Sequence, residues 1–259
     1  MTESYTKTRR DAPAGFFATE AAGLAWLAAA GGAQVVGVQE VSQTALVLDR
    51  LHPAAPEAGA AREFGRGLAR THTAGADSFG ALPPGASGYW FGPLSDPLPL
   101  PEVTADTFSA FYAEARVWPL TERCRQSGAI DSALAAGLDE VCDQLRAGRW
   151  DEVGGAPVRP ARLHGDLWAG NLMWTAGGVV LIDPAACGGH PETDLAMLEL
   201  FGAPYLAEIL AGYAETGDLA ADWRDRVGLH QLFPLLVHAL LFGGGYASAT
   251  AAAVDELLS

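Results

Sequence analysis

The sequence has few cysteines, few basic residues and no long hydrophobic run, and each shortage excludes a class of protein. The three cysteines, Cys124, Cys142 and Cys187, are widely spaced and form no CxxC pair, which argues against a disulfide framework or a structural zinc site. The first residues are polar and charged, and the longest apolar stretch, 232–245, is too short to span a bilayer. We therefore expect a soluble, cytoplasmic protein without a signal peptide.

Basic residues are outnumbered by acidic ones. The 259 residues include 31 acidic and 16 basic ones, which gives a formal net charge of −15. Such a surface repels nucleic-acid backbones and anionic lipids, so we predict no nucleic-acid partner and no membrane partner. An anionic ligand would need a metal ion or a few placed cations to neutralise it. The hydrophobic fraction of 49% is ample for the core of one large domain or two small ones.

Hydrophobic periodicity predicts a small sheet-and-helix region followed by a larger, mostly helical body, with the boundary near residue 53. A helix is expected over 16–30, and an antiparallel hairpin is expected from strands over 34–41 and 44–51. The Gly- and Pro-rich stretch 75–101 is expected to form a long surface loop. Further helices are expected over 60–73, 104–125, 130–149 and most of 192–258, and two short strands around a turn within 163–183.

One segment has the spacing of a phosphoryl-transfer site. The segment HGDLWAGN, residues 164–171, places Asp166 5 positions before Asn171, the separation between the base and the metal-binding Asn in the protein kinase catalytic loop. This spacing lets the Asp reach the attacking hydroxyl while the Asn reaches a magnesium ion on the nucleotide phosphates. Asp183 follows at the end of the apolar run 179–182, where a carboxylate suits a magnesium ligand.

A carboxylate also lies on the apolar stripe of the first predicted helix. Glu20 shares this stripe with Phe17, Leu24 and Leu27, because offsets of 3, 7 and 10 positions return to the same helix face. Burial of a carboxylate is costly unless the carboxylate meets a cation. The pattern therefore predicts a cationic partner for Glu20.

These segments resemble the fructosamine kinase (ketosamine-3-kinase) family, within the wider aminoglycoside-phosphotransferase and protein-kinase-like group. The Trp in HGDLWAGN, the Pro after Asp183 and the stretch DLAMLELFG favour fructosamine kinases over their relatives. Similarity extends to 16–24, 46–49 and 64–72, which resemble the first-lobe helix, the hinge strand and the next helix of the family. The resemblance covers most of the chain, and it is most specific in the second half.

The resemblance implies an α+β, protein-kinase-like two-lobe fold, with residues 1–53 as the N-terminal lobe and residues 54–259 as a mostly helical C-terminal lobe. Family members have two more strands, joined by a loop that covers the phosphates, before the strand that carries the lysine. This chain starts about six residues before Lys7. We therefore expect a truncated N-terminal lobe and a site that admits water.

The resemblance also assigns roles, with ATP and Mg²⁺ as cofactors and a small-molecule ketoamine or glycated amine as the substrate. Asp166 would take the proton from the sugar hydroxyl, and Asn171 and Asp183 would hold magnesium. Lys7, the only lysine before the first helix, would pair with Glu20 and hold the α- and β-phosphates. The remaining assignments are Asp49 and Leu51 for nucleotide binding at the hinge, Trp168, His190 and Glu192 for substrate contact, and His164 and Asp194 for support of the catalytic loop.

The predicted activity is transfer of the γ-phosphoryl group of ATP to a hydroxyl of a fructosamine or ribulosamine. Two alternatives stay open: a kinase of another small alcohol, such as an aminoglycoside, choline or homoserine, and a truncated, non-catalytic nucleotide-binding remnant. His190 and Glu192 could instead lie in an exposed turn, and Trp168 could be a core aromatic residue. The sequence leaves the acceptor and the oligomeric state open.

Overall fold

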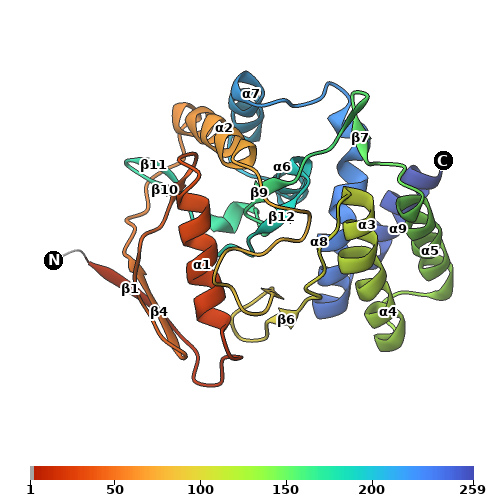
Figure 1. Cartoon of the computed structure of the whole chain (residues 1–259), viewed down its shortest axis with the longest axis horizontal. Helices are drawn as coiled ribbons and strands as arrows, with labels where there is room; N and C mark the ends of the chain where they lie inside the picture. Colours follow the sequence, from red (N-terminus) through yellow and green to blue (C-terminus); the bar gives the residue numbers. More distant parts are fainter. Residues whose placement is uncertain (1–2) are drawn as a thin grey trace.

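The N-terminal end of the molecule, red and orange in Figure 1, is built from a sheet and a helix. The computed structural model describes residues 3–259. The first helix confirms the prediction over 16–30, and its stripe of Phe17, Leu24 and Leu27 is buried. The elements are β1 (Ser4–Thr8), α1 (Phe16–Ala28), β2 (Gln34–Val35), β3 (Val38–Val41) and β4 (Ala45–Asp49), and the outer sheet has the antiparallel order β1-β4-β3.

The single strand predicted over 34–41 is wrong, because this segment is divided between two sheets. β3 pairs with β4, as the hairpin prediction requires. β2 instead pairs in parallel with β11 (Gly178–Leu181), which forms a hairpin with β10 (Leu172–Thr175). Between β2 and β3, a Cβ atom at Gly37 would lie 2.1 Å from Asp49 Oδ2, so a larger residue would displace that side chain.

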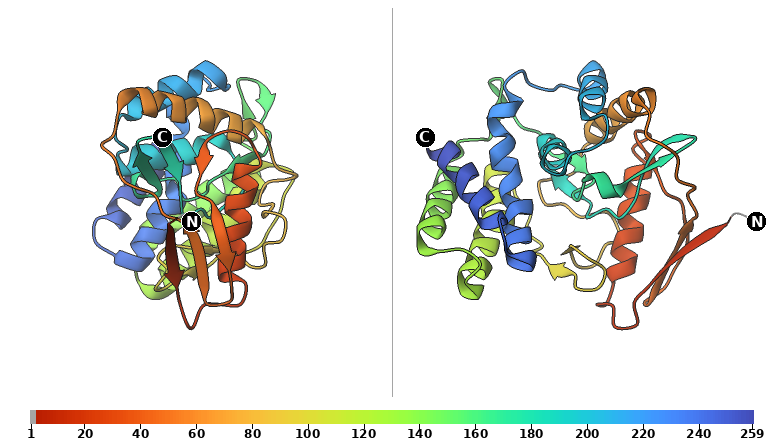
Figure 2. Two further views of the ribbon diagram at one scale, coloured as in Figure 1. Left: turned by 90° about the vertical axis from the view of Figure 1, so that its left-hand side faces the viewer. Right: turned by 180° about the vertical axis from the view of Figure 1, so that it is seen from behind.

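The rest of the chain is mostly helical, as predicted. Figures 1 and 2 show α4, α5, α8 and α9 together at the end of the molecule opposite the outer sheet. The helices are α2 (Ala58–Thr73), α3 (Phe108–Tyr112), α4 (Trp118–Ser127), α5 (Ser132–Arg146), α6 (Pro191–Phe201), α7 (Leu206–Thr216), α8 (Val227–Phe242) and α9 (Tyr246–Leu258). The short strands are β5 (Trp90–Phe91), β6 (Leu98–Pro99), β7 (Glu152–Val153), β8 (Ala156–Pro157), β9 (Ala161–Leu163) and β12 (Cys187–Gly189).

The helix predicted over 104–125 is irregular. It begins as α3, passes through a π-helical turn at Ala113–Val117 and continues as α4. Pro119 has no N–H group, and in a regular α-helix its ring would press against the carbonyl group of Ala115. The wider turn avoids this clash, and the Ala115 carbonyl oxygen accepts a hydrogen bond from Arg116 Nη1 at 3.0 Å.

Helices α2 and α7 lie side by side, in orange and blue at the top of Figure 1. Glycine makes their close approach possible: a Cβ atom at Gly65 would lie 2.0 Å from the Ile209 carbonyl oxygen, and one at Gly212 would lie 2.0 Å from that of Arg62. This packing places the C-terminal turn of α2, which carries His72, beside α7. Within residues 3–259, the structure contains no helix with the length and apolar character needed to cross a membrane.

Candidate active site

A cleft of about 760 Å³ is lined by β1, α1, the segment 164–171 and the region where α8 gives way to α9. We call the segment 164–171 the catalytic loop. The lining of the cleft includes Lys7, Glu20, Asp166, Asn171 and Asp183. The structure therefore brings together residues that the sequence analysis placed in one phosphoryl-transfer site.

Lys7, the only lysine in the sequence, lines this cleft. Its Nζ atom is 2.7 Å from Glu20 Oε1 and 3.1 Å from Asp183 Oδ1. Burial lowers the pKa of Lys7, but the two carboxylates outweigh burial and raise it above its usual value, so the ammonium group stays charged. β1 holds Lys7 in place through antiparallel pairing with β4. The partner that the apolar stripe predicted for Glu20 is thus present.

The catalytic loop orients Asp166 through a chain of hydrogen bonds. His164 Nε2 donates to the Ile182 carbonyl oxygen at 2.8 Å, which leaves Nδ1 to accept from the Asp166 N–H at 3.2 Å. Asn171 Nδ2 donates to the backbone oxygen of Asp166 at 2.7 Å and to its Oδ2 at 3.1 Å. Burial raises the pKa of Asp166 to about 7, despite the opposing hydrogen bond from Asn171. A pKa near neutrality suits a general base.

Asp183 has an unusual backbone conformation for a residue with a side chain. Its φ of 54° lies in the left-handed region, which costs about 1–3 kcal/mol for most residues other than glycine, although Asp tolerates it better than most. The Asp183 side chain is half-exposed and lines the cleft, and its backbone oxygen accepts from Asn171 Nδ2 at 3.4 Å. The strained backbone therefore holds a carboxylate beside the catalytic loop.

Asn171 and Asp183 offer oxygen ligands of the kind that Mg²⁺ prefers. Because Asn171 donates through Nδ2, its Oδ1 atom remains available as an acceptor. The Asp183 carboxylate has one oxygen within reach of Lys7 and is accessible from the cleft. The donor set thus fits a magnesium ion.

Asp194, on the first turn of α6, is fully buried behind the catalytic loop. Its Oδ2 atom accepts from the His164 N–H at 2.8 Å, and its Oδ1 atom accepts from the Gly165 N–H at 3.0 Å. His72 Nε2 lies 3.1 Å from Oδ2, and His72 Nδ1 lies 2.9 Å from the Tyr213 hydroxyl. Asp194 thus contacts the loop directly, while α2 and α7 supply partners that the sequence analysis did not assign.

We expect Asp194→Ala to destabilise the protein and to misplace Asp166. The substitution leaves buried N–H groups of the catalytic loop without an acceptor, which costs about 1–3 kcal/mol, and misplacement of the base should lower kcat by roughly tenfold or more. Urea unfolding and steady-state kinetics measure the two effects. Asp225→Ala, at an exposed position, is the control. An Asp194→Ala protein with wild-type stability and kcat would contradict the bracing role.

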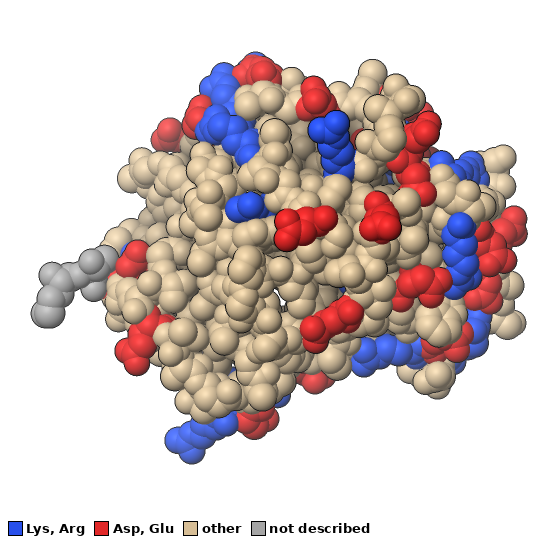
Figure 3. Space-filling model, in the orientation of Figure 1, with Lys and Arg blue, Asp and Glu red and all other residues tan. Residues whose placement is uncertain are grey.

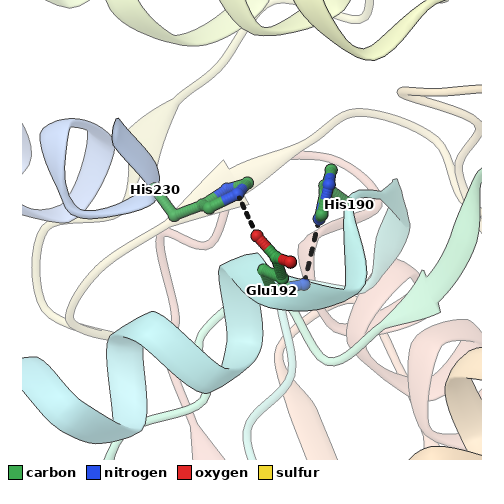
Figure 4. A group of neighbouring side chains, drawn as sticks. All are labelled: His190, Glu192 and His230. Carbon is green, nitrogen blue, oxygen red and sulfur yellow. Dashed lines mark hydrogen bonds and ion pairs between the residues drawn. The ribbon is translucent and has the colours of Figure 1, made fainter. Parts of the chain in front are cut away.

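His190 and Glu192 do not lie where substrate contact was expected, and the alternative of an exposed turn is also wrong. Both are buried, and neither lines the cleft. Figure 4 shows His190 and Glu192 at the start of α6, facing His230 from α8. Glu192 accepts two hydrogen bonds from Arg226, at 2.8 and 2.7 Å, and its Oε2 atom is 3.4 Å from His230 Nε2. This cluster fastens α6 to the beginning of α8.

The same cluster has the composition of a metal site, but its hydrogen bonds do not suit one. His190 Nδ1 accepts from the Glu192 N–H at 3.1 Å, so neutral His190 carries its proton on Nε2 and offers no lone pair there. Both carboxylate oxygens of Glu192 already bond to Arg226, whose positive charge opposes a second cation. The cluster is therefore a buried ion pair between Glu192 and Arg226, with His190 and His230 beside it.

Of the other residues predicted to contact nucleotide or substrate, Trp168 lies in the cleft, whereas Asp49 and Leu51 lie outside it. Trp168 lines the cleft with 42% of its surface exposed, so it is not a core residue. Asp49 and Leu51 do not line the cleft: Asp49 Oδ1 accepts from Gln39 Nε2 at 2.8 Å, and Leu51 packs against the core beneath β4.

Figure 3 shows that much of one face carries no charged side chain and that both signs of charge surround it.

Several cleft residues lie outside the sequence motifs and were not predicted. Tyr89 is buried and donates to the Ala185 carbonyl oxygen at 2.9 Å, which holds the segment after Asp183. Behind Tyr89, outside the cleft lining, the guanidinium carbon of Arg116 lies 4.8 Å from the centroid of the Tyr89 ring. Further lining residues come from the last turn of α8 and the start of α9, and they are His238, Leu241, Phe242 and Tyr246. Their apolar spacing matches that of a core helix, so no local pattern marks them.

Comparison with known proteins identifies the family. The sequence model of the fructosamine kinase family matches residues 2–259. The chain belongs to the fructosamine kinase family. A "Probable ketoamine kinase" of Vibrio vulnificus is 31% identical over 152 residues, which cover 59% of this chain and 50% of that protein. A "Probable ketoamine kinase" of Thermus thermophilus is 32% identical over 248 residues, which cover 94% of this chain and 83% of that protein. The match thus spans half the length of the first relative and most of the second.

Solved structures agree with this assignment. An inferred fructosamine-3-kinase from Thermobifida fusca has a TM-score of 0.89 to this chain at 42% identity, and the match covers 99% of this chain and 86% of that one. A choline/ethanolamine kinase family protein from Mesorhizobium loti has a TM-score of 0.58 at 16% identity, over 99% of this chain and 82% of that one. This second likeness concerns the fold alone. The predicted α+β, protein-kinase-like fold is confirmed.

Proposed function

We propose that this fructosamine kinase family member transfers the γ-phosphoryl group of ATP to a sugar hydroxyl of a small-molecule ketoamine, in the cytoplasm. The convergence of Asp166, Asn171, Asp183 and Lys7 on one cleft carries the proposal. In this reading residues 1–53 and 54–259 form two lobes on either side of the cleft. The ketoamine names of the relatives indicate the acceptor class.

Each charged residue in the cleft has a separate task. Lys7 binds the α- and β-phosphates. Glu20 keeps the ammonium group of Lys7 directed into the cleft, through the contact of 2.7 Å between Glu20 Oε1 and Lys7 Nζ. Asn171 Oδ1 and the Asp183 carboxylate would hold Mg²⁺, and the bound ion would neutralise phosphate charge that the acidic protein surface cannot neutralise. Asp166 accepts the proton of the sugar hydroxyl as that oxygen attacks phosphorus, while Asn171 fixes the orientation of the Asp166 carboxylate.

A substrate panel tests this function. We expect ADP release from ATP in the presence of fructosamines or ribulosamines, and we expect EDTA to abolish it, because the phosphates then lose their divalent partner. A coupled ADP assay measures the rate, and the same sugars without the amine serve as controls. Preferential turnover of an aminoglycoside, choline or homoserine would replace the ketoamine assignment. Binding of ATP without turnover of any acceptor would favour a non-catalytic protein.

A further inference from the structure

The part of the cleft lined by aromatic residues from 168–246 differs in chemistry from the part lined by Asp166 and its charged neighbours. Phe201, Phe242 and Tyr246 surround His238, with ring centroids 4.9, 5.4 and 4.9 Å from that of His238. Trp168 lies edge-on to Phe201 at 6.3 Å. All of these residues line the cleft, and we call them the aromatic end.

The aromatic end exposes large apolar side chains to water. Phe242 is 62% exposed and Trp168 is 42% exposed. Because both side chains line the same cleft, they offer apolar contact area to whatever occupies it. The same cavity reaches from Phe242 to Asp166, so an acceptor whose hydroxyl meets Asp166 can extend toward Phe242.

The aromatic end lacks a partner for a negative charge. Among the cleft-lining residues in the described part of the chain, Lys7 is the only Lys or Arg, and Lys7 already contacts Glu20 and Asp183. His238 Nδ1 donates to the Pro234 carbonyl oxygen at 2.7 Å, so the neutral ring presents Nε2 as an acceptor. Burial lowers the pKa of His238, which keeps the ring uncharged.

These features favour one kind of substituent. A carboxylate at the aromatic end would lose hydration without gaining a cation. An apolar group would cover Trp168 and Phe242, and a protonated amine nitrogen could lie against an aromatic face or donate to His238 Nε2. The substituent on the amine of a ketoamine fits this position, because it extends away from the sugar.

On the basis of the proposed ketoamine kinase activity, we propose that the aromatic end binds the substituent on the amine nitrogen. It selects uncharged, apolar substituents over substituents that bear a carboxylate. Trp168 and Phe242 make the apolar contacts, and His238 accepts a hydrogen bond from the amine or from a neighbouring hydroxyl.

Two ketoamines of the same sugar test this selection, one with an N-benzyl group and one with an N-carboxymethyl group. Calorimetric titration gives Kd, and the ADP assay gives kcat/KM. We expect the wild-type protein to bind the N-benzyl compound about tenfold more tightly, from aromatic contact and the cost of an unpaired carboxylate. Phe242→Lys supplies a cation and removes a ring, so it should reduce the ratio of affinities by about fivefold or more.

Trp118→Ala is the matched control, because Trp118 is 43% exposed but does not line the cleft. It should leave the ratio unchanged. Equal wild-type affinities for the two compounds, or a ratio that Phe242→Lys does not alter, would overturn the proposal. Selective binding of the N-benzyl compound without phosphorylation would support the aromatic end and contradict the kinase activity. Phosphorylation of both compounds with equal kcat/KM would support the kinase activity and contradict the selection of substituents by the aromatic end.

Discussion

Replacement of Asp166 by Asn is expected to lower kcat by about 10²–10⁴-fold, the usual contribution of a positioned general base. The amide keeps the shape of the carboxylate but cannot accept the hydroxyl proton at neutral pH. The KM for ATP should change little, because Lys7, Asn171 and Asp183 are the residues assigned to the phosphates and the metal. Steady-state measurement of ADP release at saturating ATP and ketoamine checks this result.

Thermal unfolding separates this loss from a loss of structure. Burial raises the pKa of Asp166 to about 7, so at pH 8 the folded state holds a carboxylate that burial disfavours. Asp166→Asn removes this cost, and Tm should therefore be unchanged or higher. Asp139→Asn, which alters an exposed ion pair with Arg125, should change neither kcat nor Tm appreciably. Wild-type kcat in Asp166→Asn would show that another group takes the proton.

The residues of this site were predictable where chemistry dictates local spacing. Asp166 and Asn171 lie on one short loop, so their separation in the sequence determines the distance between the base and the metal ligand. The carboxylate of Glu20 on an apolar stripe required a cation, and Lys7 provides it across 13 positions. Asp194 was correctly expected near the catalytic loop, although its partner His72 comes from a helix that packs only in the tertiary structure.

The errors arise where long-range packing decides the outcome. The segment 34–41 has the alternating apolar and polar residues of one strand, but its first two residues pair with β11 in another sheet. His190 and Glu192 follow the catalytic motifs in sequence, yet Arg226, 34 positions after Glu192, draws the Glu192 carboxylate into the interior. Phe242 has the sequence environment of a core helix, and only the position of α8 beside the cleft shows that it is exposed. Local pattern carries no information on such contacts.

Arg226→Met is expected to cause the largest loss of stability. Arg226 and Glu192 form a buried, two-hydrogen-bond ion pair with side-chain exposures of 10% and 5%. Removal of the guanidinium group leaves a carboxylate buried without a cation, which costs about 3–5 kcal/mol, or roughly 6–20 °C in Tm for a chain of this size. Arg224→Met is the matched control: Arg224 lies on the same 3₁₀ turn, but its side chain is 60% exposed and its ion pair with Glu199 is superficial. Its substitution should cost less than about 1 kcal/mol.

The pH dependence of unfolding identifies the carboxylate as the cause. Burial raises the pKa of Glu192, but contacts with His230 and Arg226 outweigh burial and lower the pKa to about 2, from 4.5. A carboxyl group with a depressed folded-state pKa stabilises the protein above its unfolded-state pKa, and this stabilisation disappears as pH falls through the folded-state value. Wild-type protein should therefore lose stability between about pH 4.5 and 2 through Glu192, and Arg226→Met should lose less over this range, because its Glu192 keeps the contact with His230 but not the one with Arg226. Identical pH profiles for the two proteins would refute the ion-pair explanation.

The effect of Arg226→Met on activity should be smaller than that of Asp166→Asn, because Arg226 acts only through α6. The first turn of α6 carries both Glu192, which Arg226 holds, and Asp194, which accepts from the N–H groups of His164 and Gly165. A weakened α6 should loosen the catalytic loop without removing the base, so we expect a decrease in kcat of about tenfold at a temperature where the variant is still folded. The double variant Glu192→Leu/Arg226→Met replaces the ion pair with apolar groups and should recover much of the stability, since the unpaired charge is gone. If the double variant were as unstable as Arg226→Met, the packing of the Arg226 side chain, rather than its charge, would anchor α6.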